Sequence, residues 1–253
     1  MFPYRFKRHF RRAQRQRHSL VFRWWRRLRW AGLLVLVFLA VDLFYLSLQW
    51  PDWSAIGRGT IPKSAFIQQY ELRRQQDSSL PRLQWQTVGR QHIPRHLKRA
   101  VIAAEDARFY QHKGFDLEAF QSAMSHNLEI QEFKYGASTI SQQTIKNLYL
   151  SSSRSPLRKW HELVMTVAME LNLSKERILE LYLNIAEFGQ GIYGVEAAAQ
   201  HYWQVPVASL QSWQSAQLAA CLPSPIKHNP DTATKRFYRR ARKIYGYMQQ
   251  QQK

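Results

Sequence analysis

The hydrophobic positions of this chain follow two different patterns, and each pattern predicts a different kind of element. Residues 31–50 form one nearly unbroken apolar run, and about 20 apolar residues are enough for a helix to cross a bilayer. After residue 90, apolar residues recur at i, i+3, i+4 and i+7, which is the spacing of helices that bury one face. The chain is therefore predicted to be mainly α-helical, with one N-terminal transmembrane helix before the domain.

Five segments follow from these patterns and from the glycines and prolines between them. We predict a basic tail at residues 1–30, a transmembrane helix at 31–50, a membrane-proximal connector at 51–91, a core domain at 92–232, and a basic C-terminal helix packed on the domain at 233–253. Only Ala65 to Arg74 has helical character within the connector. The core helices are predicted over Pro94 to Phe109, Ser155 to Leu171, Lys175 to about Glu187, Val195 to Trp203 and Ser209 to Leu222.

The helix that starts at Ser155 carries an apolar stripe and an unusual first turn. Its predicted buried stripe is Trp160, Leu163, Val164, Val167, Ala168 and Leu171. Arg158 and Glu162 then lie on the opposite face, where the simplest interpretation is a solvated ion pair. Arginine before glutamate is the weaker order for such a pair, and cations at a helix N-terminus oppose the macrodipole. A first turn with Arg158 and Lys159 therefore indicates a phosphate or pyrophosphate site.

The distribution of charge predicts the orientation of the transmembrane helix. Lys and Arg outnumber Asp and Glu by 37 to 17, and 11 of the 37 precede residue 31 with no acid among them. Cations on that side of the apolar run predict a cytoplasmic N-terminus, with everything after Trp50 beyond the membrane. A cleaved signal peptide is the alternative, but the run exceeds an h-region and no small-x-small site follows it. The C-terminal helix is also basic, around an apolar stripe of Phe237, Ala241, Ile244, Tyr245 and Met248.

Candidate chemistry begins at Glu105. In a helix over Pro94 to Phe109, this residue falls between Val101 and Ile102 on the helical wheel, whereas Asp106 points further away. Apolar neighbours partly desolvate the carboxylate and raise its pKa toward the range of a general base, and a second carboxylate beside it acts in the same direction. A surface acidic pair at a helix end is the alternative interpretation.

A second polar stretch follows the turn at Gly136. It brings together hydroxyls, amides and a lysine at Ser138, Thr139, Gln142, Gln143, Lys146 and Asn147. Acid in the first stretch and cation in the second suggest chemistry on a charged substrate. His112 could be a ligand or a base, but a single histidine beside Gly114 is more often a hydrogen-bonded structural residue.

One match to a dinucleotide-binding motif does not indicate a dinucleotide site. Residues 189–194 match G-x-G-x-x-G, but they follow a helix rather than a strand, and no acid occurs between Glu196 and Asp231 to hold a ribose. The glycines instead predict a tight turn before the helix at Val195.

Five stretches together resemble, in order, the motif series of the peptidoglycan glycosyltransferases. They are Glu105-Asp-x-x-Phe109-x-x-His112-x-Gly114-x-Asp116, Gly136-x-Ser138-Thr139-Ile-x-Gln142-Gln143-x-x-Lys146-Asn147, Arg158-Lys159-x-x-Glu162, Ser174-Lys-x-x-Ile178-Leu-Glu-x-Tyr182-Leu-Asn184 and Gly189-x-Gly191-x-x-Gly194-x-x-x-Ala198-Ala199-x-x-Tyr202. The resemblance covers about residues 90 to 225. Ser141 stands where the family usually has threonine, and Trp203 where it often has phenylalanine.

The resemblance implies a lysozyme-like fold that polymerises lipid II into β-1,4 glycan strands with inversion. It makes Glu105 the base for the acceptor 4-hydroxyl, and Glu162 a second catalytic carboxylate that acts directly or through a divalent cation such as Mg²⁺ or Mn²⁺. The residues implied to bind phosphate are Lys146, Arg158 and Lys159, and those implied to line the donor site are Ser138, Thr139, Gln142 and Gln143. The remaining substrate-binding residues implied are Asp106, Phe109, His112 and Asn147.

The resemblance also sets the expected surroundings and the alternatives. A bacterial inner membrane location, a periplasmic catalytic domain, and lipid II, glycan and membrane lipids as partners are expected, together with division or elongation proteins but no nucleic acid. A lytic, lysozyme-like hydrolase is the enzymatic alternative. Because a hydrolase needs a neutral acid and a pyrophosphate leaving group needs cations, Lys146, Arg158 and Lys159 favour the transferase. A membrane-tethered binder of nucleic acid or anionic glycan is the non-enzymatic alternative.

Overall fold

The computed structural model describes residues 4–48, 50–129, 138–151, 153 and 155–250. The chain divides into two compact units, Met1–Pro51 and Asp52–Lys253. Gly136, which opens the second motif, lies outside the described residues.

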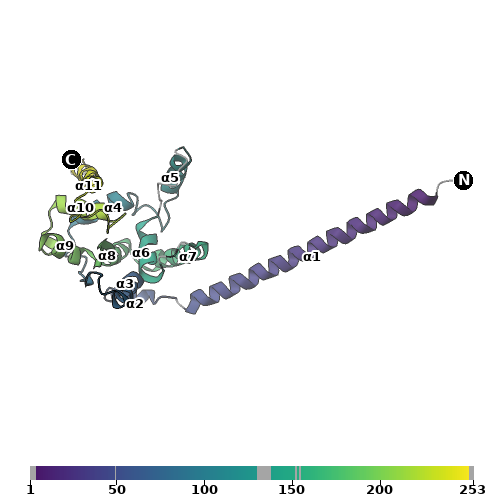
Figure 1. Ribbon diagram of the computed structural model, residues 1–253, viewed down its shortest axis with the longest axis horizontal. Coiled ribbons are helices and arrows are strands. Elements are labelled where there is room, and N and C mark those ends of the chain that lie inside the picture. Colours follow the sequence, from purple (N-terminus) through teal and green to yellow (C-terminus); the bar gives the residue numbers. More distant parts are fainter. Residues whose placement is uncertain (1–3, 49, 130–137, 152, 154, 251–253) are drawn as a thin grey trace. The chain divides into compact units, whose positions relative to one another are not determined.

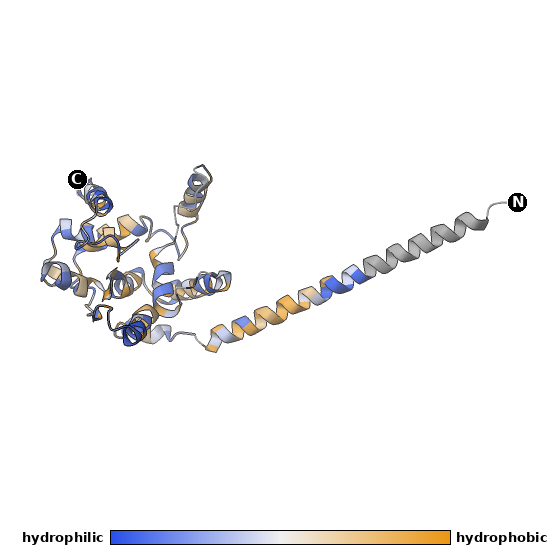
Figure 2. Cartoon of the chain, viewed as in Figure 1, coloured by the Kyte–Doolittle hydropathy of each residue, from blue (hydrophilic) through white to orange (hydrophobic). Residues whose placement is uncertain are grey.

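The first unit is built on one long helix, α1 (Tyr4–Leu48). Its stretch Arg23–Leu48 is 26 residues long with a mean hydropathy of 2.4, which is long and apolar enough to cross a membrane. Figure 2 shows the apolar band of this helix and the hydrophilic turns that precede it. Most of its large apolar side chains are exposed, as lipid-facing side chains are. The helix is consistent with the predicted single-pass membrane anchor.

The second unit is mainly helical, and its helices pack in two groups (Figure 1). The helix α4 packs against α10 and α11, whereas α6 packs against α7, α8 and α3. The helices are α2 (Trp53–Arg58), α3 (Ala65–Gln76), α4 (Arg95–Glu105), α5 (Leu117–Glu129), α6 (Ile140–Tyr149), α7 (Pro156–Asn172), α8 (Lys175–Ile185), α9 (Val195–Trp203), the short 3-10 helix η1 (Val207–Ser209), α10 (Ser212–Cys221) and α11 (Lys235–Gln250). The prediction of a mainly α-helical domain is confirmed.

Three short strands, β1 (Gln84–Trp85), β2 (Glu187–Gly189) and β3 (Ile192–Tyr193), form a small sheet in the order β1-β3-β2. Strand β1 pairs in parallel with β3, and β2 pairs with β3 antiparallel. The glycine pattern makes the turn that was predicted, because Gly191 and Gly194 have φ angles of 77° and 80°. A Cβ atom on Gly194 would also lie 2.7 Å from the carbonyl oxygen of Asn184.

The connector predicted at residues 51–91 contributes to the same compact unit as the core domain. Ile67 and Tyr70 of α3 are buried and cluster with Tyr193 of β3. Strand β1 also comes from this segment, so part of the connector completes the small sheet.

Two helices end earlier than their periodicity predicts. The helix α4 stops at Glu105 rather than Phe109, because Asp106 leaves the helical conformation with φ −160° and ψ 72°. The helix α8 stops at Ile185, because the chain then extends into β2. Glu105 is thus the last helical residue, at the point where the chain turns.

The buried face of α7 differs from the predicted stripe, and this prediction was wrong. Trp160, Val167 and Leu171 are 41%, 44% and 76% exposed, whereas Met165 and Met169 are buried. Both faces of this helix are apolar, so periodicity alone could not choose between them. The face that carries Glu162 packs inward.

The helix α11 buries most of its predicted stripe. Phe237, Ala241, Ile244 and Met248 join the hydrophobic core, and Tyr245 is partly buried against it. Because α11 is fixed in this way on α10 and α4, its arginines project from a defined surface.

Candidate active site

The predicted base Glu105 is held inside the domain where several helices meet. Its side chain is 11% exposed, and it lines a cavity of about 290 Å³ together with Ser138 and Thr139. Burial is the main cause that raises the pKa of Glu105. The predicted rise through desolvation is therefore confirmed, but Asp106 is not among its causes.

Both oxygens of the Glu105 carboxylate accept hydrogen bonds. Gln143 Nε2 donates to Oε2 at 3.0 Å, and Arg240 Nη2 donates to Oε1 at 2.9 Å. These bonds and the charge of Lys146 favour the ionised form, so they oppose the effect of burial on the pKa. Tyr182 of α8 donates its hydroxyl hydrogen to Gln143 Oε1 at 2.9 Å. The carboxylate is thus oriented from α6 and α11, with support from α8.

Asp106 has a different role from its neighbour. Its carboxylate accepts hydrogen bonds from the backbone N–H of Ile140 at 2.9 Å and from His112 Nε2 at 2.9 Å. The backbone N–H of Gly114 donates to His112 Nδ1 at 3.2 Å, so the ring proton of His112 resides on Nε2. His112 is the hydrogen-bonded structural residue that the sequence favoured. The pair joins the end of α4 to the start of α6.

The second motif forms the N-terminus of α6. Thr139 and Gln142 make a capping box in which each side chain accepts a hydrogen bond from the backbone N–H of the other. Thr139 Oγ1 also donates to the carbonyl oxygen of Gly114 at 2.7 Å. Ser138 is exposed beside the Glu105 cavity, whereas Gln142 is buried. Capping thus places Ser138 and Gln143 next to the base.

The first turn of α7 gathers the predicted cations around Glu162. This carboxylate is 2% exposed; Arg158 Nη1 lies 2.6 Å from its Oε2, and Lys159 Nζ contacts its Oε1. Within the described part of the chain, the buried Nε of Arg158 has no hydrogen-bond partner. The first turn of α7 therefore holds two cations beside one buried carboxylate.

Lys146 links the two halves of the site electrostatically. Burial is the main cause that lowers its pKa, with Arg158 and Lys159 acting in the same direction. Glu162 and Glu105 both act to raise it. Its Nζ also lies 5.8 Å from the ring centre of Phe66 in α3. The first three motifs therefore converge on one electrostatically coupled cluster.

Two predicted substrate-binding residues do not line the cavity beside Glu105. Phe109 is fully buried in the hydrophobic core, and Lys175 Nζ lies 4.5 Å from its ring centre. Phe109 therefore supports the end of α4 from the hydrophobic core, and its predicted contact with substrate stays a prediction. Asn147 lies half-buried near the end of α6.

The donor groups of this site do not fit a divalent cation well. Both oxygens of Glu162 already face Arg158 and Lys159, so a cation there would have to displace a positive neighbour. Among the described residues, Asp106, His112 and Asp116 lie close enough to share a metal. In that group, however, the His112 nitrogens and the Asp106 oxygens are engaged in protein hydrogen bonds.

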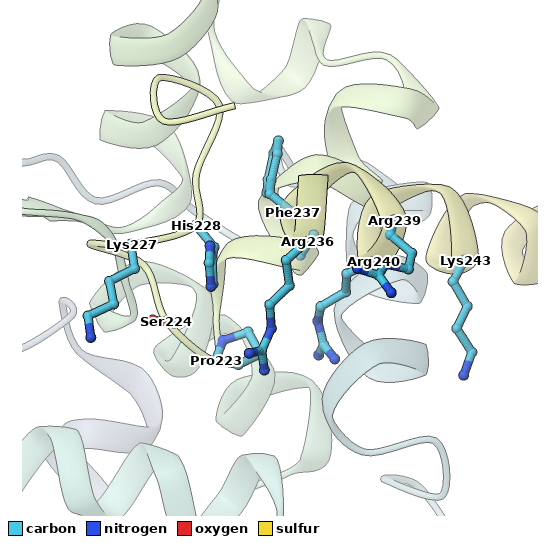
Figure 3. Close-up of a pocket in the computed structure, with 10 residues that line it drawn as sticks. Pro223, Ser224, Lys227, His228, Arg236, Phe237, Arg239, Arg240 and Lys243 are labelled. Atoms are coloured by element: carbon cyan, nitrogen blue, oxygen red, sulfur yellow. The ribbon is translucent and has the colours of Figure 1, made fainter. Parts of the chain in front are cut away.

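Arg240 also lines a second, strongly basic cavity (Figure 3). It has a volume of about 650 Å³, and its lining includes Lys227, His228, Arg236, Arg239, Arg240 and Lys243. Figure 3 shows Arg236, Arg240 and Lys243 extending from α11 in the same direction. None of its lining residues is acidic.

Sequence reasoning missed Arg240, Tyr182 and Phe66 as parts of the site. Tyr182 stood in a recognised motif, so its spacing could have suggested a role. Phe66 lies in the connector, and Arg240 is one of six Lys and Arg residues on α11. Nothing in the local pattern distinguishes that arginine from its neighbours.

Comparisons with known proteins identify the family of this chain. A family model described as "Transglycosylase" matches residues 74–249. A protein named biosynthetic peptidoglycan transglycosylase from Nitrosomonas eutropha is 45% identical over 181 residues, which are 72% of this chain and 74% of that protein. A protein of the same name from Methylobacillus flagellatus is 41% identical over 224 residues, which are 88% of this chain and 96% of that protein. The chain therefore belongs to the transglycosylase family.

Proposed function

We propose that this chain is a peptidoglycan glycosyltransferase that polymerises lipid II into β-1,4-linked glycan strands and releases undecaprenyl pyrophosphate. Family membership and the name shared by its relatives support glycosyl transfer in peptidoglycan synthesis. The observation that carries the proposal is the arrangement of one buried carboxylate, Glu105, in a field of cations from α6, α7 and α11.

The reaction follows from that arrangement. The 4-hydroxyl oxygen of the acceptor sugar attacks the anomeric carbon of the donor, and Glu105 takes the hydroxyl proton. The bond from that carbon to the pyrophosphate oxygen breaks, and the electron pair leaves with the pyrophosphate. Attack opposite the leaving group inverts the anomeric carbon.

The leaving group meets the cations of α6 and α7. Lys146, Arg158 and Lys159 can stabilise the charge that develops on the pyrophosphate. Glu162 holds Arg158 and Lys159 in place through its buried carboxylate. Glu162 therefore orients these two cations.

A lytic enzyme fits this site less well. Cleavage of a glycan expels a poor alkoxide, which needs a neutral carboxylic acid as proton donor. Both oxygens of Glu162 are ion-paired, and Arg240 and Gln143 favour the ionised form of Glu105. Glu162 is therefore not arranged as a proton donor, and the comparisons do not favour lysis either.

The basic cavity beside Arg240 supports a reaction between two charged partners. Both the donor and an acceptor lipid II molecule carry a pyrophosphate, so a polymerase needs cations on both sides of its base. The cations of α7 supply one set, and the cavity lined by α11 supplies the other.

Membrane placement is proposed from exposed apolar side chains and from the anchor. Leu117 and Leu128 of α5 are 71% and 68% exposed, and Leu171 of α7 is 76% exposed. Such side chains suit a lipid surface, where a polyprenyl-linked substrate resides. We infer an inner-membrane protein with its basic N-terminus in the cytoplasm and its catalytic unit in the periplasm.

The proposal is tested with detergent-solubilised full-length protein and labelled lipid II. Products are resolved on a gel and then digested with lysozyme, and Glu105→Gln is run in parallel. Lysozyme-sensitive polymer from the unchanged protein alone supports the proposal. Cleavage of preformed glycan without polymer formation would replace it with the lytic alternative.

A further inference from the structure

Arg240 lies outside all five recognised motifs, yet it makes the closest ionic contact of Glu105. Its Nη2 lies 3.1 Å from the carbonyl oxygen of Ala104 and 2.9 Å from Glu105 Oε1. One guanidinium nitrogen therefore binds both the backbone end of α4 and the side chain that follows it. This contact joins residues 135 positions apart in the chain.

The other side of the same carboxylate is held just as specifically. The hydroxyl of Tyr182 donates to Gln143 Oε1, so the amide of Gln143 must turn its nitrogen toward Glu105. Gln143 and Arg240 thus engage one oxygen each. A carboxylate has about four acceptor positions, so each oxygen keeps a lone pair for an incoming proton.

We propose that Arg240 is a positioning residue for catalysis, which orients the Glu105 carboxylate and keeps it ionised for removal of the acceptor proton. The inference rests on the proposed function, because it gives Glu105 the role of base. It adds a residue that neither the motifs nor the comparisons assign.

The charges around Glu105 explain why this contact matters. Burial raises the pKa of Glu105, while Gln143 and Lys146 from α6 and Arg240 from α11 lower it. The hydroxyl of Tyr182 from α8 acts on this carboxylate through Gln143, to which it donates its hydrogen, and the negative charge of Glu105 is one cause that raises the pKa of Tyr182. Without Arg240, only the amide of Gln143 and the weaker effect of Lys146 would oppose the rise in the pKa of Glu105 that burial causes.

The neighbouring cations of the basic cavity allow a matched comparison. Arg236 lies one helical turn before Arg240 on α11 and lines the same cavity (Figure 3). Among the cations that the structure describes, only Arg240 has an ion pair with Glu105. A general loss of cavity charge can thus be separated from loss of the contact with the base.

The experiment measures kcat and KM for lipid II polymerisation against pH, using full-length Arg240→Gln, Arg240→Lys and Arg236→Gln. In Arg240→Gln the acid limb of kcat/KM moves to higher pH by about one unit, because a charge within about 4–6 Å shifts a carboxyl pKa by one to three units. Arg240→Lys moves the limb less. Arg236→Gln changes KM without moving the limb.

An unmoved limb in folded Arg240→Gln, or an equal movement in Arg236→Gln, would overturn the proposal. Thermal unfolding shows which variants fold. If Arg240→Gln does not fold, Arg240→Lys is the deciding variant. An acid limb at higher pH in Arg240→Lys supports the proposal. An acid limb and a kcat identical to those of the unchanged protein overturn it. Failure of the unchanged protein to make polymer would instead refute the proposed function itself.

Discussion

The carboxylate of Asp106 accepts a hydrogen bond from the backbone N–H of Ile140 at 2.9 Å, which ties the end of α4 to the first residue of α6. The helix that carries the base and the helix that carries Gln143 and Lys146 are thereby held in one register. Asp106 is 7% exposed, so this bond is protected from water.

Replacement of Asp106 by asparagine tests that connection. The asparagine amide has the size of the carboxylate but no charge. It therefore accepts weaker hydrogen bonds from the backbone N–H of Ile140 and from His112 Nε2. Because hydrogen bonds to charged groups contribute about 1.5–3 kcal/mol, we expect a loss of this order in the free energy of unfolding, together with a lower kcat. Denaturant unfolding and the polymerisation assay measure the two effects. Asp77→Asn, at an exposed turn, is the control, and equal stability of both variants would contradict the prediction.

Glu105→Gln should leave a folded protein that binds lipid II but does not polymerise it. Loss of a general base costs roughly 10²–10⁴ in rate, so kcat should fall by at least this factor with little change in binding. Polymerisation at the normal rate would remove Glu105 from the mechanism.

The same variant has a second, pH-dependent signature in stability. A carboxyl whose pKa is raised in the folded state favours folding below its unfolded pKa, and this contribution is lost as pH rises through the folded pKa. Glu105→Gln should therefore be at least as stable as the unchanged protein at about pH 7, and the difference should shrink toward about pH 4. Calorimetry at several pH values measures it, and a destabilised variant at neutral pH would contradict the raised pKa.

Arg158→Ala should weaken lipid II binding and turnover together, because it removes a cation from the pyrophosphate site. It should also destabilise the domain, but by less than the about 3–5 kcal/mol of a fully broken buried ion pair, because Lys159 still contacts Glu162. The double variant Arg158→Ala with Glu162→Gln removes both charges, so it should regain stability without regaining activity. Unfolding and steady-state kinetics separate the two effects, and normal kinetics in the single variant would mean that Arg158 is only a structural charge.

Chelation tests the assignment of phosphate binding to side chains. Since Glu162 is already paired with Arg158 and Lys159, we expect polymerisation to continue after EDTA treatment and dialysis. The lipid II assay with and without added Mg²⁺ or Mn²⁺ measures this. Loss of activity on chelation, with recovery on addition of either ion, would return Glu162 to the role of metal ligand.

The local pattern of the sequence determined the helical class, the apolar anchor helix, the buried stripe of α11 and the glycine turn before α9. It also predicted the burial of Glu105, whereas phosphate binding by Arg158 and Lys159 stays a prediction. These features depend on helical periodicity, capping or the residues next in the chain, so they can be predicted from local sequence patterns. The family motifs added the chemical roles, which periodicity cannot supply.

Tertiary structure alone decided which apolar face of α7 turns inward and that Phe109 supports the site from the core. It also selected Arg240 from the basic residues of α11 and oriented Gln143 through Tyr182. The contacts responsible join residues 39 positions apart in the case of Tyr182 and Gln143, and 135 in the case of Arg240 and Glu105. A pattern along the chain carries no information about such partners, because the energy that selects them arises only when distant helices pack together.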